Sequence, residues 1–235
     1  DSTLANLYEV KVPAEINSKT ARRLSVPNEA PEFVRNVLGE FIGTNGDNIP
    51  VSAFPVDGTF PTATTQWEKR NIGLEIPVWD TEVCIQCGKC VIVCPHAAIR
   101  EKVVSADTLI DAPIGYLSAP AKWRQFPDQR FTLQVATEDC TGCTLCHEVC
   151  PAVSKADPSH RALMMLPQAP RVAQERINWE FFHNLPEVDR SALNLATVKD
   201  AALAQPLFEF SGACAGCGET PYIRLLTQLY GDHLV

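Results

Sequence analysis

The sequence has no long hydrophobic run and no concentrated basic segment. Its uninterrupted apolar stretches are only a few residues long, whereas a membrane-spanning helix needs about 20 apolar residues, so no membrane span is expected. No charged-then-apolar leader precedes the first predicted domain. The net charge of −8 and the pI of about 5.1 argue against nucleic acid as a partner, because phosphate binding needs a basic face.

Cysteine is frequent, but it is not dense enough for a small secreted disulfide scaffold. The 235 residues contain 10 cysteines, and eight of these crowd into two short runs. The first run extends from Cys84 to Pro95 and the second from Cys140 to Pro151. Clustering of this kind indicates metal ligands rather than disulfides, and ligand thiolates persist in a reducing compartment.

Both runs have the spacing Cys-x2-Cys-x2-Cys-x3-Cys-Pro, which is typical of bacterial two-cluster ferredoxins. Three closely spaced cysteines can wrap one face of a [4Fe-4S] cube, and the fourth cysteine of each run then ligates the other cube. The sequence therefore predicts two [4Fe-4S] clusters and single-electron transfer. The predicted ligand sets are Cys84, Cys87, Cys90 and Cys150 for one cluster, and Cys140, Cys143, Cys146 and Cys94 for the other.

Zinc is the main alternative, but a structural zinc site usually uses two Cys-x2-Cys pairs, and each run has a third closely spaced thiolate. We expect His96 and His147, which flank the runs, to be surface groups or groups near a cluster rather than ligands. The 45 residues from Pro95 to Asp139 form a large insertion between the two sets of cysteines. Its Trp123 and Phe126 either shield a cluster from water or simply pack the insertion.

The remaining pattern predicts an α+β fold, in which short strands precede both runs. Tyr8, Val10 and Val12 alternate with charged residues and predict an early strand. Helices are expected at 28–42, at 171–185, from Ser191 towards Pro206, and after Thr220, with Ile223, Leu225, Leu226, Leu229 and Tyr230 as the buried stripe of the last helix. An irregular connector is expected at 44–66 and a further strand at 162–166.

The last two cysteines, Cys214 and Cys217, lie in a glycine-rich loop just before the predicted helix at Thr220. Alone, such a pair could be half of a metal site, a redox pair or half of a zinc site. The position at a helix N-terminus favours an anionic ligand.

Taken together, the residues Thr65–Gly73, the two cysteine runs and Gly212–Tyr222 resemble, in this order, an internal segment of the single-chain pyruvate:ferredoxin (or flavodoxin) oxidoreductases. This resemblance implies an oxidoreductase that converts pyruvate and coenzyme A into acetyl-CoA and carbon dioxide with thiamine diphosphate, magnesium and three [4Fe-4S] clusters. Cys214 and Cys217 would be two ligands of the third cluster, and Glu219 would contact thiamine diphosphate. The segment alone is expected to be inactive on pyruvate.

The resemblance also implies a ferredoxin-like two-cluster domain with a large insertion, placed between an irregular α/β connector and helices that open a thiamine-binding domain. The expected division is 1–24 (tail of an upstream domain), 25–75 (connector), 76–170 (two-cluster domain) and 171–235 (start of the thiamine domain). Expected partners are ferredoxin or flavodoxin and the rest of the parent enzyme, itself a homodimer in the cytoplasm or a reducing organelle. The alternative is a free-standing two-cluster electron carrier without catalysis.

Overall fold

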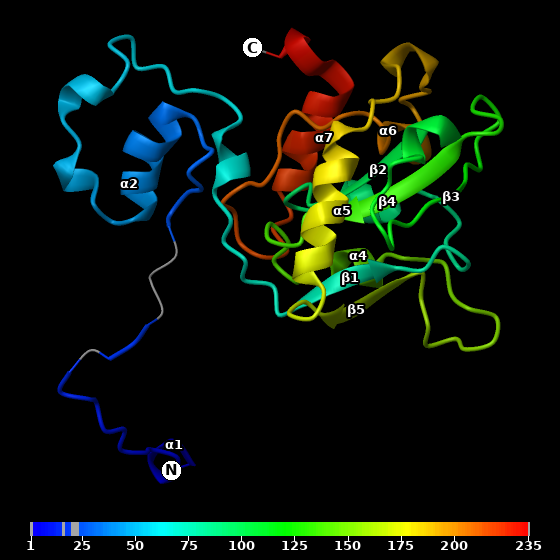
Figure 1. The fold of residues 1–235 in the computed structure, drawn as a ribbon. Coiled ribbons are helices and arrows are strands. Elements are labelled where there is room, and N and C mark those ends of the chain that lie inside the picture. Colours follow the sequence, from blue (N-terminus) through cyan, green and yellow to red (C-terminus); the bar gives the residue numbers. More distant parts are fainter. Residues whose placement is uncertain (1, 16, 20–23, 235) are drawn as a thin grey trace. The chain divides into compact units, whose positions relative to one another are not determined.

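The computed structural model describes residues 2–15, 17–19 and 24–234 (Figure 1). It divides the chain into two compact units, Asp1–Phe54 and Pro55–Val235. The four-part division expected from the sequence is finer and stays a prediction. Among the described residues, none of the helices combines the length and the apolar character that crossing a membrane requires.

The first unit is helical and small. The predicted helix at 28–42 is confirmed over residues 34–42, where a π-helical turn continues directly into an α-helix. Val34 and Val37 are buried in this helix. The predicted strand at Tyr8, Val10 and Val12 is wrong: these residues have no regular structure and are exposed, and none of the strands in the described part of the chain pairs with them. The elements of this unit are α1 (Ser2–Ala5), η1 (Val34–Leu38), α2 (Gly39–Ile42), η2 (Gly46–Asn48) and η3 (Val51–Ala53).

The second unit contains two antiparallel sheets that interlock the duplicated halves (Figure 1). Each cysteine run follows a strand, ends in a short helix and is followed by another strand. The first half is β1 (Glu75–Trp79), α3 (Lys89–Val93) and β2 (Ile99–Val104); the second half is β4 (Arg130–Val135), α4 (Leu145–Glu148) and β5 (Leu163–Pro167). Strands pair across the halves, because β1 pairs with β5 and β2 pairs with β4. Neither half can therefore complete its sheet alone.

The insertion between the runs packs against these sheets. It contributes η5 (Ala106–Leu109) and the short strand β3 (Ala119–Pro120), which pairs with β4. Trp123 stacks on Phe131 with ring centroids 5.6 Å apart, and Trp79 meets the same ring edge-on at 5.5 Å. All three rings are buried, and Phe131 is the central member of this core.

The C-terminal part of this unit contains two longer helices, with short helical elements between and after them. The predicted long helix from Ser191 is wrong, because Asp189 Oδ1 accepts hydrogen bonds from the amide and hydroxyl of Ser191 and closes a turn instead. The helix begins later, where the Thr197 hydroxyl caps it. The elements are η4 (Thr64–Trp67) before β1, and then α5 (Val172–Asn184), η6 (Arg190–Ala192), α6 (Val198–Ala201), α7 (Thr220–Tyr230) and η7 (Gly231–His233).

Helix α7 begins where predicted but presents the opposite face to the domain. Its polar residues Arg224 and Gln228 are each 1% exposed, whereas Leu226 is 46% exposed. Arg224 donates hydrogen bonds to the carbonyls of Val91, Ile92 and Cys94 at the end of α3. Carbonyls at a helix C-terminus need donors beyond the helix ladder, and the buried Arg224 guanidinium supplies such donors here, although the apolar pattern predicts another face to be buried.

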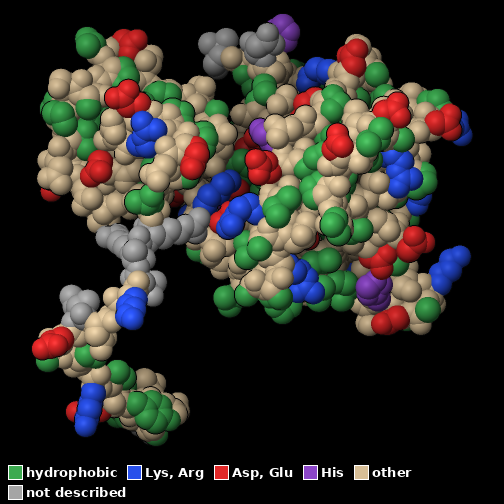
Figure 2. Space-filling view, in the orientation of Figure 1, with side chains coloured by type: hydrophobic (Ala, Val, Ile, Leu, Met, Phe, Trp, Pro, Cys, Tyr) green, Lys and Arg blue, Asp and Glu red, His purple; other side chains and the backbone are tan. Residues whose placement is uncertain are grey.

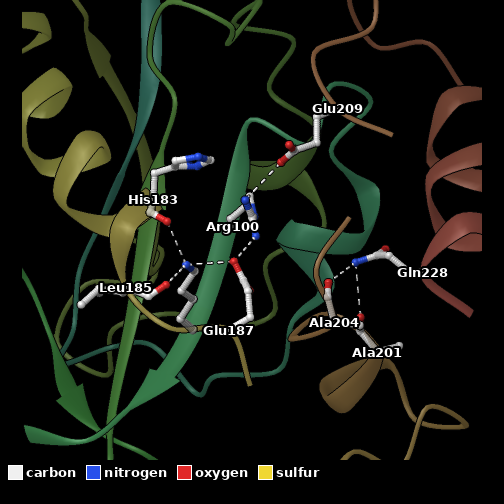
Figure 3. Close-up of polar contacts among 9 residues, drawn as sticks. Arg100, His183, Leu185, Glu187, Ala201, Ala204, Glu209 and Gln228 are labelled. Carbon is white, nitrogen blue, oxygen red and sulfur yellow. Dashed lines mark hydrogen bonds and ion pairs between the residues drawn. The ribbon is translucent and has the colours of Figure 1, made fainter. Parts of the chain in front are cut away.

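Charged side chains of both signs are interspersed on the face of the second unit that Figure 2 shows, without one large basic patch. Three charged residues in succession, Arg100, Glu101 and Lys102, are nevertheless buried on β2. Glu187 is 2.9 Å from both Arg100 and Lys102, and Glu209 is 3.2 Å from Arg100 (Figure 3). This buried network ties β2 to the segments that follow α5.

Candidate metal centre

The eight cysteines of the two runs surround two separate cavities. The first cavity is lined by Cys84, Cys87, Cys90 and Cys150, and the second by Cys94, Cys140, Cys143 and Cys146. The two cavities are small and similar in size. The structure thus brings together the same two sets of four cysteines that the spacing predicts, with the fourth cysteine exchanged between the runs. All ten cysteines of the chain are free thiols.

The cysteine loops have the same backbone design in both halves. Gln86 and Gly88 have positive φ values of 56° and 73°, and Gly142 and Thr144, at the matching positions, have 67° and 66°. These left-handed residues turn the chain around the cavity and aim an amide inwards. The Gln86 amide lies 3.3 Å from Cys84 Sγ, and the Gly142 amide lies 3.5 Å from Cys140 Sγ. Such N–H···S contacts are among the features that set a cluster's reduction potential.

Gly88 is expected to be intolerant of any side chain. A Cβ atom there would lie 2.6 Å from the Ala202 Cβ and 3.2 Å from the Val198 carbonyl oxygen, at a φ of +73°. We expect Gly88→Ala to cost about 2–5 kcal/mol, the sum of left-handed strain and overpacking. Gly115→Ala is the matched control, because its φ is +84° with nothing within 4 Å. Thermal unfolding of both variants, with iron content, checks this, and equal losses would contradict it.

Burial makes the thiolate form of several ligands unfavourable without metal. Loss of solvent raises the pKa of Cys140 to about 12, and burial also raises the pKa of Cys90 well above its usual value. Nearby thiolates add to the effect, since Cys84 and Cys87 raise the pKa of Cys90 further. Positive iron in the cavity would offset this cost, so cluster binding and proton release from the thiols are coupled.

The arrangement of the thiols fits a cluster better than a single ion. A tetrahedral zinc site with Zn–S bonds of about 2.3 Å needs sulfur atoms about 3.8 Å apart. Within the described ranges, no three Cys, His, Asp or Glu side chains converge closely enough to hold one metal ion. The four thiols instead surround a volume, as the ligands of a cube must.

Each cavity also has a buried polar group without a partner among the described residues. In the first cavity, both carboxyl oxygens of Glu101 lack a hydrogen bond, and burial raises the pKa of this carboxyl to about 8. In the second cavity, His96 Nε2 lacks a partner. Buried polar groups rarely remain unpaired, so these atoms fit an acceptor or donor group inside the cavities.

The two histidines that flank the cysteine runs differ in burial. His96 is buried, and its Nδ1 lies 3.1 Å from the Ser211 carbonyl oxygen. His147 is partly buried, with Nδ1 2.7 Å from the Leu163 carbonyl oxygen. His96 also lines the second cavity, which agrees with the expectation of a group near a cluster, whereas the position of each histidine beside a cysteine run did not distinguish the two.

Aromatic rings cover the first cavity. Trp79 and Phe131 line it directly, while Trp123 is stacked behind Phe131 and donates a hydrogen bond from Nε1 to Asp200 Oδ1 at 2.8 Å. Of the two insertion aromatics singled out from the sequence, Trp123 thus contributes indirectly. Phe126 is buried in the same core.

Cys214 and Cys217 lie outside both cavities, in an exposed loop before α7. Amides of Thr220 and Glu219 lower the pKa of Cys217, which favours a thiolate there. The loop lies next to the second cavity, since a Cβ on Gly216 would be 3.7 Å from the Cys143 Cβ. Two thiols supply only half of a cubane site. Glu219 is exposed at the start of α7.

Sequence reasoning missed Glu101 as a cavity residue. The sequence has no local signal for it, because a run of three charged residues between Ile99 and Val103 is normally interpreted as facing solvent. The structure nevertheless buries all six residues of β2.

Comparison with known proteins adds two family models and a group of relatives. Residues 19–73 match the EKR model, described as a domain of unknown function, and residues 83–153 match the 4Fe-4S double cluster binding domain. The second match spans both cysteine runs and supports two [4Fe-4S] clusters there.

The whole chain is also similar to longer proteins. It is 54% identical to the pyruvate-flavodoxin oxidoreductase of a Nostoc strain and 51% identical to that of Trichormus variabilis. It is 44% identical to the pyruvate:ferredoxin oxidoreductase of Moorella thermoacetica. Each alignment covers 100% of this chain but 20% of the relative. The chain therefore spans about a fifth of the length of the curated relatives it matches.

Proposed function

Because this chain corresponds over its full length to one segment of the pyruvate-flavodoxin and pyruvate:ferredoxin oxidoreductases, we propose that it is the electron-transfer segment of such an enzyme. The parent activity proposed is the oxidation of pyruvate with coenzyme A to acetyl-CoA and carbon dioxide, with ferredoxin or flavodoxin as acceptor. Thiamine diphosphate with magnesium, a third [4Fe-4S] cluster, a homodimeric parent and a reducing compartment such as the cytoplasm belong to the same proposal.

The observation that carries the proposal is the sorting of eight thiols into two sets of four. We assign Cys84, Cys87, Cys90 and Cys150 to one cluster and Cys140, Cys143, Cys146 and Cys94 to the other. When bound, each [4Fe-4S] cluster supplies a one-electron redox centre. The chain's own residues hold the thiols, aim amides at sulfur and exclude water with Trp79, Phe131 and the neighbouring apolar side chains.

The C-terminal loop supports the third part of the proposal. Cys214 and Cys217 are proposed as two ligands of the third cluster, and Glu219 as a contact to thiamine diphosphate. Support comes from the close approach of Gly216 in this loop to Cys143 of the second cavity, which would place the third cluster at one end of the pair. A free-standing carrier is not favoured, because the match to the enzymes includes this loop and runs through the whole chain.

Anaerobic reconstitution of the chain tests the proposal. We expect about eight iron and eight sulfide per chain, and after reduction an EPR signal split by spin coupling between neighbouring cubes. Little or no pyruvate oxidation is expected from this chain alone. A colourless protein that binds about two zinc ions would overturn the proposal.

A further inference from the structure

The segment Thr65–Gly73 contacts the second cysteine run on one side. The Lys69 ammonium lies 2.5 Å from Asp139 Oδ2, and the Asn71 amide donates to the Glu138 carbonyl oxygen at 2.9 Å. Gly73 passes so close to the run that a Cβ atom there would lie 2.7 Å from the Cys140 carbonyl oxygen. The segment is thus pressed against the residues that lead into Cys140.

On its other side the same segment holds the approach to the Cys214 loop. Arg70 donates to the carbonyl oxygens of Ser211 at 3.0 Å and Ala213 at 3.4 Å. The Thr65 hydroxyl donates to the Glu209 carbonyl oxygen at 3.1 Å, and the Lys69 ammonium lies 4.7 Å from the centroid of the Phe210 ring. Lys69 and Arg70 are adjacent in sequence, yet together they reach both cysteine-bearing regions.

The Cys214 loop, residues 212–219, is largely exposed. A Cβ atom on Gly212 or Gly218 would meet nothing within 4 Å, and Cys214 itself is exposed. Gly216 approaches the second cavity near Cys143, and Ser211, which leads into the loop, lies against His96 in the wall of the same cavity. Charge-assisted hydrogen bonds from Arg70 to Ser211 and Ala213 therefore add to the hydrogen bonds that Ser211 makes with His96 and Pro95 in fixing the approach to this loop.

We infer that Thr65–Gly73 is a brace that fixes the Cys214/Cys217 loop at a set distance from the second cluster site, with Lys69 and Arg70 as positioning residues. Electron transfer falls steeply with distance, so a loop that carries cluster ligands needs such support from surrounding residues. The inference gives a role to the end of the segment matched by the EKR model. It depends on the proposed function only for the role of the cysteines.

Amide hydrogen exchange of the reconstituted chain tests the brace. In Arg70→Gln we expect the amides of Phe210 and Cys217, which donate to His96 and Cys214 carbonyls, to exchange about ten- to a hundredfold faster. Lys69→Gln should speed exchange at Phe210 and also at Asp139 and Cys140. Arg70→Lys keeps the charge and should restore part of the protection.

Glu68→Gln is the matched control, because the Glu68 side chain makes no hydrogen bond or ion pair within the part of the chain that the structure describes. It should leave exchange unchanged, and exchange in β2 and β4 should be unchanged in every variant. Unchanged exchange in Arg70→Gln would overturn the brace, and so would a uniform rise that includes β2 and β4. Iron content is read separately: a chain that never binds iron refutes the proposed function, whatever the exchange rates.

Discussion

Replacing Cys94 with alanine should remove the cluster of the second run, although Cys94 belongs to the first. Cys94 lines the cavity of Cys140, Cys143 and Cys146, so its loss leaves three ligands there and four in the other cavity. Iron should fall from about eight to about four per chain, and the spin coupling between reduced cubes should disappear. Iron analysis and EPR of the anaerobically reconstituted chain measure both effects.

The reciprocal variant and a control make this test specific. Cys150→Ala should remove the other cluster, because Cys150 lines the cavity of Cys84, Cys87 and Cys90. Cys214→Ala is the control, since Cys214 is exposed outside both cavities, and it should leave about eight iron in place. If Cys94→Ala instead abolished the cluster of the first run and spared the second, the exchange of fourth ligands would be refuted.

Arg224→Met should destabilise the second unit strongly. The buried guanidinium donates to three carbonyl oxygens at the end of α3, and methionine would remove all of these charge-assisted hydrogen bonds from a buried site. We expect a loss of about 3 kcal/mol or more, which corresponds to a fall in Tm of about 6–12 °C. Arg224→Lys should recover only part, because one ammonium cannot reproduce the planar fork. Thermal unfolding of the anaerobically reconstituted variants measures the shift.

Leu226→Ala, on the same helix, is the matched control for that result. Its side chain is 46% exposed, so truncation should change the Tm by little, although the apolar pattern of the sequence predicts it to be buried. A larger effect at Leu226 than at Arg224 would mean that the apolar face of α7, and not its polar face, packs on the domain.

The sequence was most informative where chemistry fixes spacing. The two cysteine runs predicted both groups of four thiols, because a cube constrains its ligands whatever the surrounding fold. It was least informative about α7, since periodicity shows that a helix has two faces but not which one meets the domain. The partners of Arg224 are carbonyl oxygens more than 120 residues away, and every residue type offers such a carbonyl.

The burial of charged residues on β2 also could not be predicted from the local sequence pattern. Arg100 and Lys102 are paired by Glu187, which lies more than 80 residues further along the chain. A charged residue in a strand is normally read as facing solvent, and only the distant carboxylate makes its burial tolerable. Local pattern also could not predict that β1 pairs with β5 and β2 with β4, because the alternation of side chains identifies a strand but not its neighbour.

The pairing of strands across the duplicated halves has a consequence for how the protein is made. While a ribosome is still translating the insertion, β1 has no partner strand and the first three cysteines have no fourth. At about 5–20 residues per second, the nascent chain passes through this incomplete stage for several seconds at least. Iron delivered during that interval would meet an open loop, so we expect productive loading to begin only after β5 has emerged.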